Sequence, residues 1–159
     1  MPISAYIKSI REKIGHDFLL LPGVLAIVFD DAGRVLLNRR SDNGKWAVVG
    51  GAVDPGEEPA DAAVREVLEE TGIIARVDRV SGVYTTRITT YPNGDVAQYV
   101  SIAFRCSAIG GKPTPADDES LDVAFFALDQ IPPDVTPDYV QRIKEAAGDG
   151  AAVFTRKTE

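Results

Sequence analysis

The sequence predicts an α/β fold, in which helices pack against a mixed β-sheet. Short apolar runs that are typical of strands outnumber the helical segments and are interleaved with them. The 159 residues suit one domain, and 45% of them are hydrophobic, which is enough to bury a core. Because neither a repeat nor a low-complexity linker divides the sequence, we expect one domain over residues 1–148 with an N-terminal helix, followed by a loose tail over residues 149–159.

Three segments carry helix signals at both ends. Apolar residues recur at helical spacing in the first segment, which has a candidate N-cap at Ser4 and a stop at Gly15. The second is Pro59–Thr71, with proline in its first turn and glycine just past its end. Thr136 followed by proline opens the third, which ends near Gly148.

The strands are expected where apolar runs lie between turn residues. These runs cover residues 24–29, 34–39, 46–49, 75–90, 96–106 and 123–127. The Asp/Gly segment 30–33 predicts a hairpin between the first two runs. Segment 91–95 supplies the Pro, Asn and Gly of a second turn.

Composition excludes several functions. Seventeen basic and 24 acidic residues give a net charge of −7, which makes a nucleic acid an unlikely main partner. No apolar run is long enough to cross a membrane, and no secretory signal opens the chain. A single cysteine, Cys106, fits a cytoplasmic protein, and a single histidine, His16, argues against a His-rich metal site.

Acidic residues form a stripe on the second predicted helix. Glu66, Glu69 and Glu70 stand at positions i, i+3 and i+4 and share one face. The opposite, apolar face is expected to pack on the sheet; it comprises Ala60, Val64, Val67, Leu68 and Thr71. One interpretation is a solvated helix face. The other is a cation site, since like charges that share a face destabilise a helix and folding does not require them.

A glycine-rich loop beside the stripe favours the cation site. Gly50, Gly51 and Gly56 precede the helix and allow the backbone to approach a ligand closely. Carboxylates are suitable ligands for Mg²⁺, which commonly bridges them to the phosphates of a substrate. An acidic protein can bind a polyphosphate in this way.

The segment Gly51–Ile73 resembles the Nudix box. Gly51, Glu57, the pair Arg65-Glu66, Glu69-Glu70 and Gly72 stand at the spacing of that motif. The resemblance implies a Nudix-type α/β/α sandwich and an enzyme that hydrolyses a nucleoside diphosphate linked to another group, with Mg²⁺ or Mn²⁺. Many members have proline before the paired glycines, where this sequence has Val49.

The resemblance also implies roles for individual residues. The metal ligands would be Glu66, Glu69, Glu70 and the backbone carbonyl of Gly50, and either Glu66 or Glu69 would also act as general base. Glu57 and Arg65 would orient the helix. Members often add an acidic ligand from a later loop, and within Asp117-Asp118-Glu119 we select Glu119. The alternative for Glu119 is an exposed loop carboxylate.

The substrate is less well defined by the sequence. Arg39, Arg40 and Arg87 are candidates to contact phosphates, although arginines at strand edges are commonly only solvated. The candidates to stack on a base, which are equally suited to a core, are Trp46, Tyr84, Tyr91 and Tyr99. We select Arg39, Arg40 and Tyr91 as substrate-binding residues. ADP-ribose or a related derivative is favoured over an oxidised nucleoside triphosphate.

A second hypothesis is a non-catalytic Nudix-fold module that binds a nucleotide. Such modules would be expected to lose the carboxylates of the box, whereas Glu66, Glu69 and Glu70 are all present here. The expected partner in either case is a small nucleotide, and the sequence leaves a homodimer open.

Overall fold

The computed structural model describes residues 4–116 and 118–156. Three helices lie within these residues: α1 (Ala5–Ile14), α2 (Pro59–Thr71) and α3 (Pro137–Ala147). The strands within them are β1 (Leu19–Phe29), β2 (Val35–Arg40), β3 (Trp46–Ala47), β4 (Val49–Ala52), β5 (Ile73–Thr85), β6 (Thr89–Thr90), β7 (Val96–Gly111), β8 (Ser120–Phe126) and β9 (Val153–Phe154).

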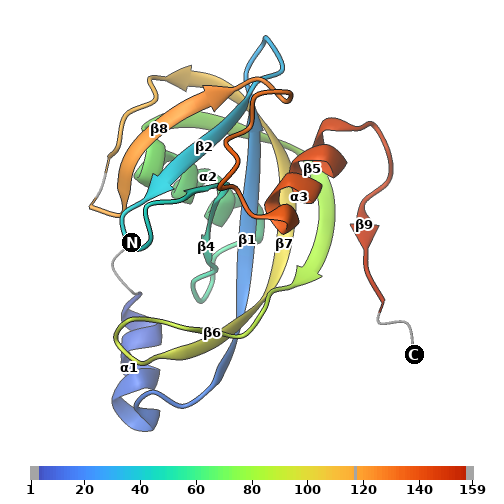
Figure 1. Cartoon of the computed structure of the whole chain (residues 1–159). Helices are drawn as coiled ribbons and strands as arrows, with labels where there is room; N and C mark the ends of the chain where they lie inside the picture. The colour runs from blue at the N-terminus through green and yellow to red at the C-terminus, as the bar shows by residue number, and fades with distance from the viewer. Residues whose placement is uncertain (1–3, 117, 157–159) are drawn as a thin grey trace.

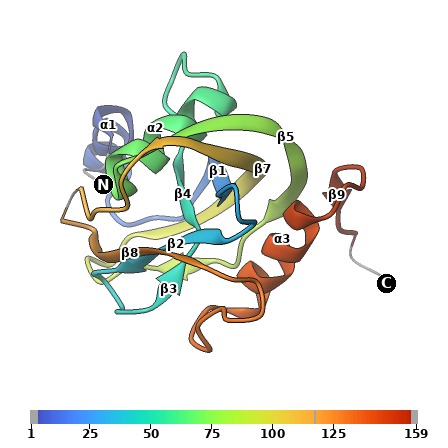
Figure 2. The ribbon, with the colours of Figure 1, turned by 90° about the horizontal axis from the view of Figure 1, so that it is seen from above.

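The sheet is mixed, as the sequence predicts. Strand β1 pairs in parallel with β7 and antiparallel with β4. The order along the main path is β3-β2-β1-β7-β5-β9, while β8 pairs with β2 and β6 with β7. Helices α2 and α3 lie on opposite sides of the sheet, and α1 lies at one end beside β6 (Figures 1 and 2). The predicted α/β sandwich is therefore confirmed.

Strand β1 is apolar on both faces because both faces are covered. Its residues Val24, Ala26 and Val28 belong to the core between the sheet and α2. Ile27 and Phe29 belong to the second core, between the sheet and α3. This alternation places β1 at the centre of the molecule.

The predicted helix boundaries agree with the structure. Ser4 caps α1, since its hydroxyl accepts a hydrogen bond from the amide of Ile7 at 3.2 Å. Helix α2 covers the predicted residues and ends at Gly72, whose φ of 68° lies in the left-handed region that glycine adopts most easily. Thr136 is the N-cap of α3.

The packing face predicted for α2 is partly wrong. Leu68 is 49% exposed instead of buried against the sheet. The buried residues are Ala62, Ala63, Glu66, Val67, Glu70 and Thr71, so two carboxylates lie on the buried side. The prediction included Leu68 because it lies four residues after the apolar Val64. In the structure, the small Ala62 and Ala63 allow the helix to approach the sheet on its acidic side.

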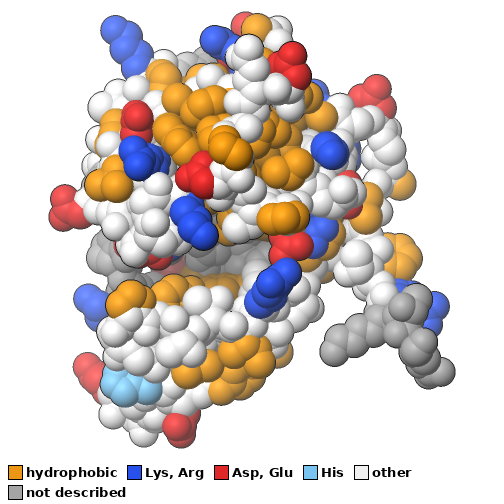
Figure 3. All heavy atoms as spheres, viewed as in Figure 1, with side chains coloured by type: hydrophobic (Ala, Val, Ile, Leu, Met, Phe, Trp, Pro, Cys, Tyr) orange, Lys and Arg blue, Asp and Glu red, His pale blue; other side chains and the backbone are white. Residues whose placement is uncertain are grey.

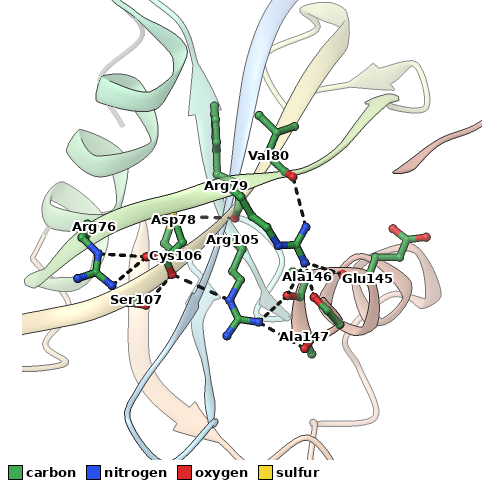
Figure 4. A network of polar contacts seen from close by, with 12 residues as sticks. Arg76, Asp78, Arg79, Val80, Arg105, Cys106, Ser107, Glu145, Ala146 and Ala147 are labelled. Atoms are coloured by element: carbon green, nitrogen blue, oxygen red, sulfur yellow. Dashed lines mark hydrogen bonds and ion pairs between the residues drawn. The ribbon is translucent and has the colours of Figure 1, made fainter. Parts of the chain in front are cut away.

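Helix α3 is held at its C-terminal end by two arginines of the sheet (Figure 4). Arg79 donates to the carbonyl oxygens of Glu145, Ala146 and Gly148. Arg105 donates to those of Ala146 at 2.9 Å and of Ala147 at 3.3 Å. These carbonyls lack partners inside the helix, so the guanidinium groups complete its hydrogen bonding.

Three further segments differ from the expectation. The strand predicted over 75–90 is divided into β5, which ends at Thr85, and β6 (Thr89–Thr90). The strand predicted over 46–49 is divided at Val48 into β3, which pairs with β2, and β4, which pairs with β1. Within the segment expected to be a loose tail, Val153–Phe154 forms β9 and pairs with Gly82–Val83 of β5. Residues 157–159 lie outside the described residues.

Candidate active site

Arg65 on α2 gathers three carboxylates around one guanidinium group. Its Nε donates to Oε1 of Glu57 at 2.7 Å, and its Nη2 donates to Oε2 of the same side chain at 3.0 Å. Its Nη1 donates to Glu66 at 2.8 Å and to Glu69 at 3.2 Å. The guanidinium lowers the pKa of Glu57, and its own pKa is raised chiefly by its hydrogen bonds with that carboxylate. This geometry fixes the loop before α2 to the acidic side of the helix.

Glu66 is fully buried, with 0% of its surface exposed. Its Oε1 accepts from Arg65, while its Oε2 has no hydrogen-bond partner among the described residues. Burial raises the pKa of Glu66 to about 7, although Arg65 acts in the opposite direction. A Cβ at position 51 would collide with this carboxylate, so Gly51 is required for Glu66 to reach the loop.

Glu70, one turn further along α2, meets β2. It is 5% exposed, and its Oε2 accepts a hydrogen bond of 2.8 Å from Nδ2 of Asn38. The same Nδ2 donates to the hydroxyl of Ser120 at 3.2 Å. Glu70 is thus oriented by a neutral donor, whereas Glu66 is oriented by a cation.

The other predicted ligands come from α2, from β4 and from the residue before β8. Glu69 is 46% exposed and reaches Arg65. Gly50 lies in β4 next to Gly51, packed closely on Val24 and Leu25 of β1. Glu119 precedes β8, and its backbone carbonyl accepts from the amide of Ser41 at 2.7 Å. Asp117 lies outside the described residues.

The donor set fits a divalent cation, although it is not preassembled as a metal cluster. No three Asp, Glu, His or Cys side chains of residues 4–116 and 118–156 are grouped closely enough to hold a metal as they stand. However, Glu66 presents a buried oxygen that nothing in the described chain satisfies. An unmatched buried acceptor is costly, and a cation would remove that cost.

Arg39 and Arg40 differ in their surroundings. Arg39 is exposed and donates to the carbonyl of Gly44 at 2.9 Å. Arg40 is held by Asp42 through two hydrogen bonds of 2.9 and 2.7 Å. This carboxylate is the main cause of the raised pKa of Arg40, and Tyr139 and Glu70 contribute through their charges. Arg40 stands two residues after Asn38 on β2, the strand that meets Glu70.

Tyrosines from two elements converge near Arg40. The pKa of Tyr99 is raised by burial first and then by its neighbour Tyr91. The pKa of Tyr139, on α3, is raised by burial and is influenced by Arg40 and Tyr91. In the space-filling view the surface is hollowed between the body and the part that contains α1 and the turn from β6 to β7 (Figure 3). Tyr91, Tyr99, Tyr139 and Arg40 form what we call the tyrosine wall.

The other predicted aromatic and nucleophilic candidates serve the fold. Tyr84 is 5% exposed, and its hydroxyl donates to Glu145 of α3 at 2.5 Å. The ring of Trp46 packs edge-to-face on Phe126. Cys106 is buried, and burial raises its pKa to about 12, which suppresses a thiolate nucleophile. His16 binds Asp95 at 2.7 Å, away from α2.

Sequence reasoning missed Asn38, Ser120 and Tyr139. Asn38 gave a signal, because it is a polar residue directly after the apolar Val35, Leu36 and Leu37 of β2. Tyr139 gave none, since an aromatic residue in the first turn of a helix is ordinary.

Comparison with known proteins supports the resemblance of the sequence to the Nudix family. Residues 19–146 match the model of the NUDIX domain. The chain is 36% identical over 135 residues to a "MutT-like protein" of Streptomyces ambofaciens, which covers 84% of this chain and 80% of that protein. It is 36% identical over 108 residues to an "ADP-ribose pyrophosphatase" of Methanocaldococcus jannaschii, covering 66% and 61% of the two chains. It is 32% identical over 123 residues to a "Putative 8-oxo-dGTP diphosphatase" of Bacillus subtilis, covering 77% of each.

The fold is similar to solved structures as well. A NUDIX hydrolase from Nitrosomonas europaea superposes with a TM-score of 0.67 at 27% identity, covering 80% of this chain and 88% of that one. None of the helices in the described residues has the length and apolar content needed to cross a bilayer.

Proposed function

This chain belongs to the NUDIX family and is a pyrophosphohydrolase of that family, and we propose that it hydrolyses a nucleoside diphosphate linked to another group, with ADP-ribose as the favoured type of substrate. Hydrolases of this family use divalent metal ions. We propose Mg²⁺ or Mn²⁺ for this chain, in a cytoplasmic setting and without nucleic acid as a substrate. The observation that carries the proposal is the buried, unmatched oxygen of Glu66 beside Glu70 and the glycine loop.

The proposed ligands of the cation are Glu66, Glu69, Glu70, Glu119 and the carbonyl of Gly50. When bound, the cation supplies positive charge for the phosphate oxygens and lowers the pKa of the attacking water. Arg65 keeps Glu66 and Glu69 on the same side of α2, and Glu57 in turn fixes the guanidinium of Arg65. The protein thus contributes position and charge, which phosphoryl transfer needs most.

The general base is proposed to be Glu66 or Glu69. Glu69 is half exposed and accessible to water, whereas Glu66 is buried with a free acceptor. Separate Glu→Gln variants distinguish them. The variant whose loss of kcat exceeds its loss of Mn²⁺ affinity by the larger factor identifies the base, because a residue that acts only as a ligand should affect both quantities together.

The tyrosine wall is proposed to bind the nucleoside, with Arg40 near the phosphates. Three rings and a cation on one side of the acidic site suit a flat base attached to a polyanion. Tyr91→Ala should raise KM with a smaller effect on kcat, whereas Tyr91→Phe, which retains the ring, should stay close to the wild type. Arg39 is proposed to contribute less, since it lies exposed beside Gly44.

A substrate panel tests the proposed function. The purified protein is incubated with ADP-ribose, other nucleoside diphosphate derivatives and 8-oxo-dGTP, each with Mg²⁺ or Mn²⁺. We expect the highest kcat/KM for ADP-ribose, which yields two phosphomonoesters per water consumed. Release of pyrophosphate from 8-oxo-dGTP at a higher kcat/KM would instead assign the activity named for the Bacillus subtilis relative. If no compound is turned over with either ion, the proposed function is wrong.

A further inference from the structure

Asn38 is a buried amide in a strand that otherwise supplies the core. Only 3% of its surface is exposed, and the preceding Leu36 and Leu37 are fully buried. A leucine or valine would continue the apolar run of β2 at this position, and burying an amide costs free energy unless its hydrogen bonds are made. The amide of Asn38 is therefore expected to serve a purpose other than packing of the core.

The two hydrogen bonds of its Nδ2 join three elements. They reach Glu70 on α2 at 2.8 Å and Ser120 at the start of β8 at 3.2 Å. Glu70 and Ser120 are themselves only 5% and 6% exposed, so solvent does not compete for these bonds. Ser120 directly follows Glu119 in the sequence. Asn38 consequently links the helix with its carboxylates to the strand that begins beside Glu119.

The Oδ1 of Asn38 is buried and, within the described part of the chain, has no hydrogen-bond partner. The amide therefore donates to Glu70 and Ser120 and leaves an acceptor for a donor that arrives with the ligand. Glu66 Oε2, one helical turn from Glu70, is in the same condition. One of these oxygens belongs to a residue that donates to Glu70, and the other belongs to a residue of the same helix as Glu70.

The chemistry of an amide suits this place better than that of a charged residue. Lysine or arginine beside Glu70 would neutralise its carboxylate and compete with a cation, while aspartate would repel it. The amide donates a hydrogen bond that orients Glu70 and adds no charge of its own beside it.

We propose that Asn38 is a positioning residue that orients the Glu70 carboxylate for cation binding and links it to the start of β8. This inference rests on the cation site of the proposed function. It predicts that removal of the amide weakens binding of the cation in a protein that remains folded.

The test measures Mn²⁺ binding to the full chain by isothermal titration calorimetry, without substrate. Asn38→Leu should raise the Kd for Mn²⁺ about tenfold or more. The metal-free protein should remain folded with a lower Tm, because the buried Glu70 and Ser120 each lose the hydrogen bond from this amide. Asn38→Ala removes the same donor if the larger leucine prevents folding, and it should raise the Kd similarly.

Thr71→Val is the matched control. Thr71 is a buried polar residue of the same helix, and its hydroxyl donates to the carbonyl of Val67 at 2.5 Å. Its loss should lower the Tm and leave the Kd for Mn²⁺ within about twofold, since it acts on the core.

Glu70→Gln separates the two ways in which the account can fail. If Glu70→Gln weakens Mn²⁺ binding and both Asn38 variants bind Mn²⁺ like the wild type, the positioning role is wrong and the cation site stands. If Glu70→Gln also leaves the Kd unchanged, the cation site of the proposed function is itself overturned.

Discussion

The two helices that cover the sheet are both held by polar side chains, but they differ in how completely the buried polar groups are hydrogen-bonded. At α3, Arg79 and Arg105 donate to the last carbonyl groups of the helix (Figure 4). Tyr84 in addition donates to the side chain of Glu145. At α2, Arg65 and Asn38 also provide donors to buried carboxylates. However, Glu66 Oε2 and Asn38 Oδ1 have no partner among the residues that the structure describes.

This difference separates charges that serve the fold from charges that serve a ligand. Guanidinium groups that complete the hydrogen bonds of a helix end stabilise the folded chain. Buried acceptors that remain unmatched destabilise it, so they are retained where a ligand uses them. The contacts at the end of α3 thus serve the fold, whereas the acidic side of α2 is our proposed cation site.

The largest effect is expected for Glu70→Gln. The substitution removes a negative charge from the proposed cation site and keeps the shape of the side chain, so kcat should fall by about a hundredfold or more, roughly 2.7 kcal/mol of transition-state stabilisation. Thermal unfolding should show a folded protein, because the acidic face loses repulsion. Turnover equal to that of the wild type would contradict the role of α2 as a site.

Arg105→Met tests the opposite side of the comparison. Loss of its hydrogen bonds to Ala146 and Ala147 should reduce the free energy of unfolding by about 1–3 kcal/mol, measured by urea denaturation. Binding of Mn²⁺ should not change. Arg76→Met is the control, since Arg76 is 64% exposed and pairs with Asp78 two residues away, so its effect should be within about 0.5 kcal/mol. Reduced Mn²⁺ affinity in Arg105→Met would contradict the distinction between the structural contacts at the end of α3 and the proposed cation site on α2.

Glu119→Gln tests whether the proposed site includes a ligand from outside α2. Helix α2 supplies carboxylates from one side, and the cation needs oxygen ligands from another segment or from water. We expect turnover to fall about tenfold, roughly 1.4 kcal/mol of transition-state stabilisation. Asp118→Asn is the neighbouring control and should have a much smaller effect. If both variants behave like the wild type, the loop before β8 is only a solvated connection.

Acidity gives the most gradual of these effects, because it is spread over the pH range from 4.5 to about 7. The pKa of Glu66 in the folded, metal-free chain is raised to about 7 from an ordinary 4.5, so between these values the folded state binds more protons than the unfolded state. The stability that protonated Glu66 contributes to the folded state is present in full below pH 4.5. It is lost as the pH rises through 7, and the free energy of unfolding falls with a slope of at most about 1.4 kcal/mol per pH unit. Urea denaturation with a chelator at several pH values measures it, and Glu66→Gln should flatten the slope. An equal slope in this variant would assign it to other groups.

The sequence predicted the helices well and the strands less well. Ser4, Pro59, Gly72 and Thr136 act through local capping and turn geometry, which neighbouring residues determine. The division at Val48 depends on which strands the two halves join, and β9 depends on the exposed edge of β5. Such long-range pairing leaves no local pattern.

The candidate site was predicted as a set of residues, but its burial was not. The spacing of Glu66 and Glu70 placed them on one face, and a helical pattern cannot tell that this face packs on the sheet. That outcome depends on the small size of Ala62 and Ala63 and on the space left by Gly51. Asn38 lies far from the box in the sequence, so only the fold brings it to Glu70.

The most direct test of the central claim is the effect of Mn²⁺ on thermal unfolding. A cation that binds only the folded chain, at a hundred times its Kd, stabilises it by about 2.7 kcal/mol, which corresponds to a rise in Tm of roughly 5–10 °C for a chain of this size. We predict this rise for the wild type and its loss in the triple variant Glu66→Gln, Glu69→Gln, Glu70→Gln. A wild-type Tm that does not respond to Mn²⁺, or an equal rise in the triple variant, would contradict the claim that these carboxylates form the site.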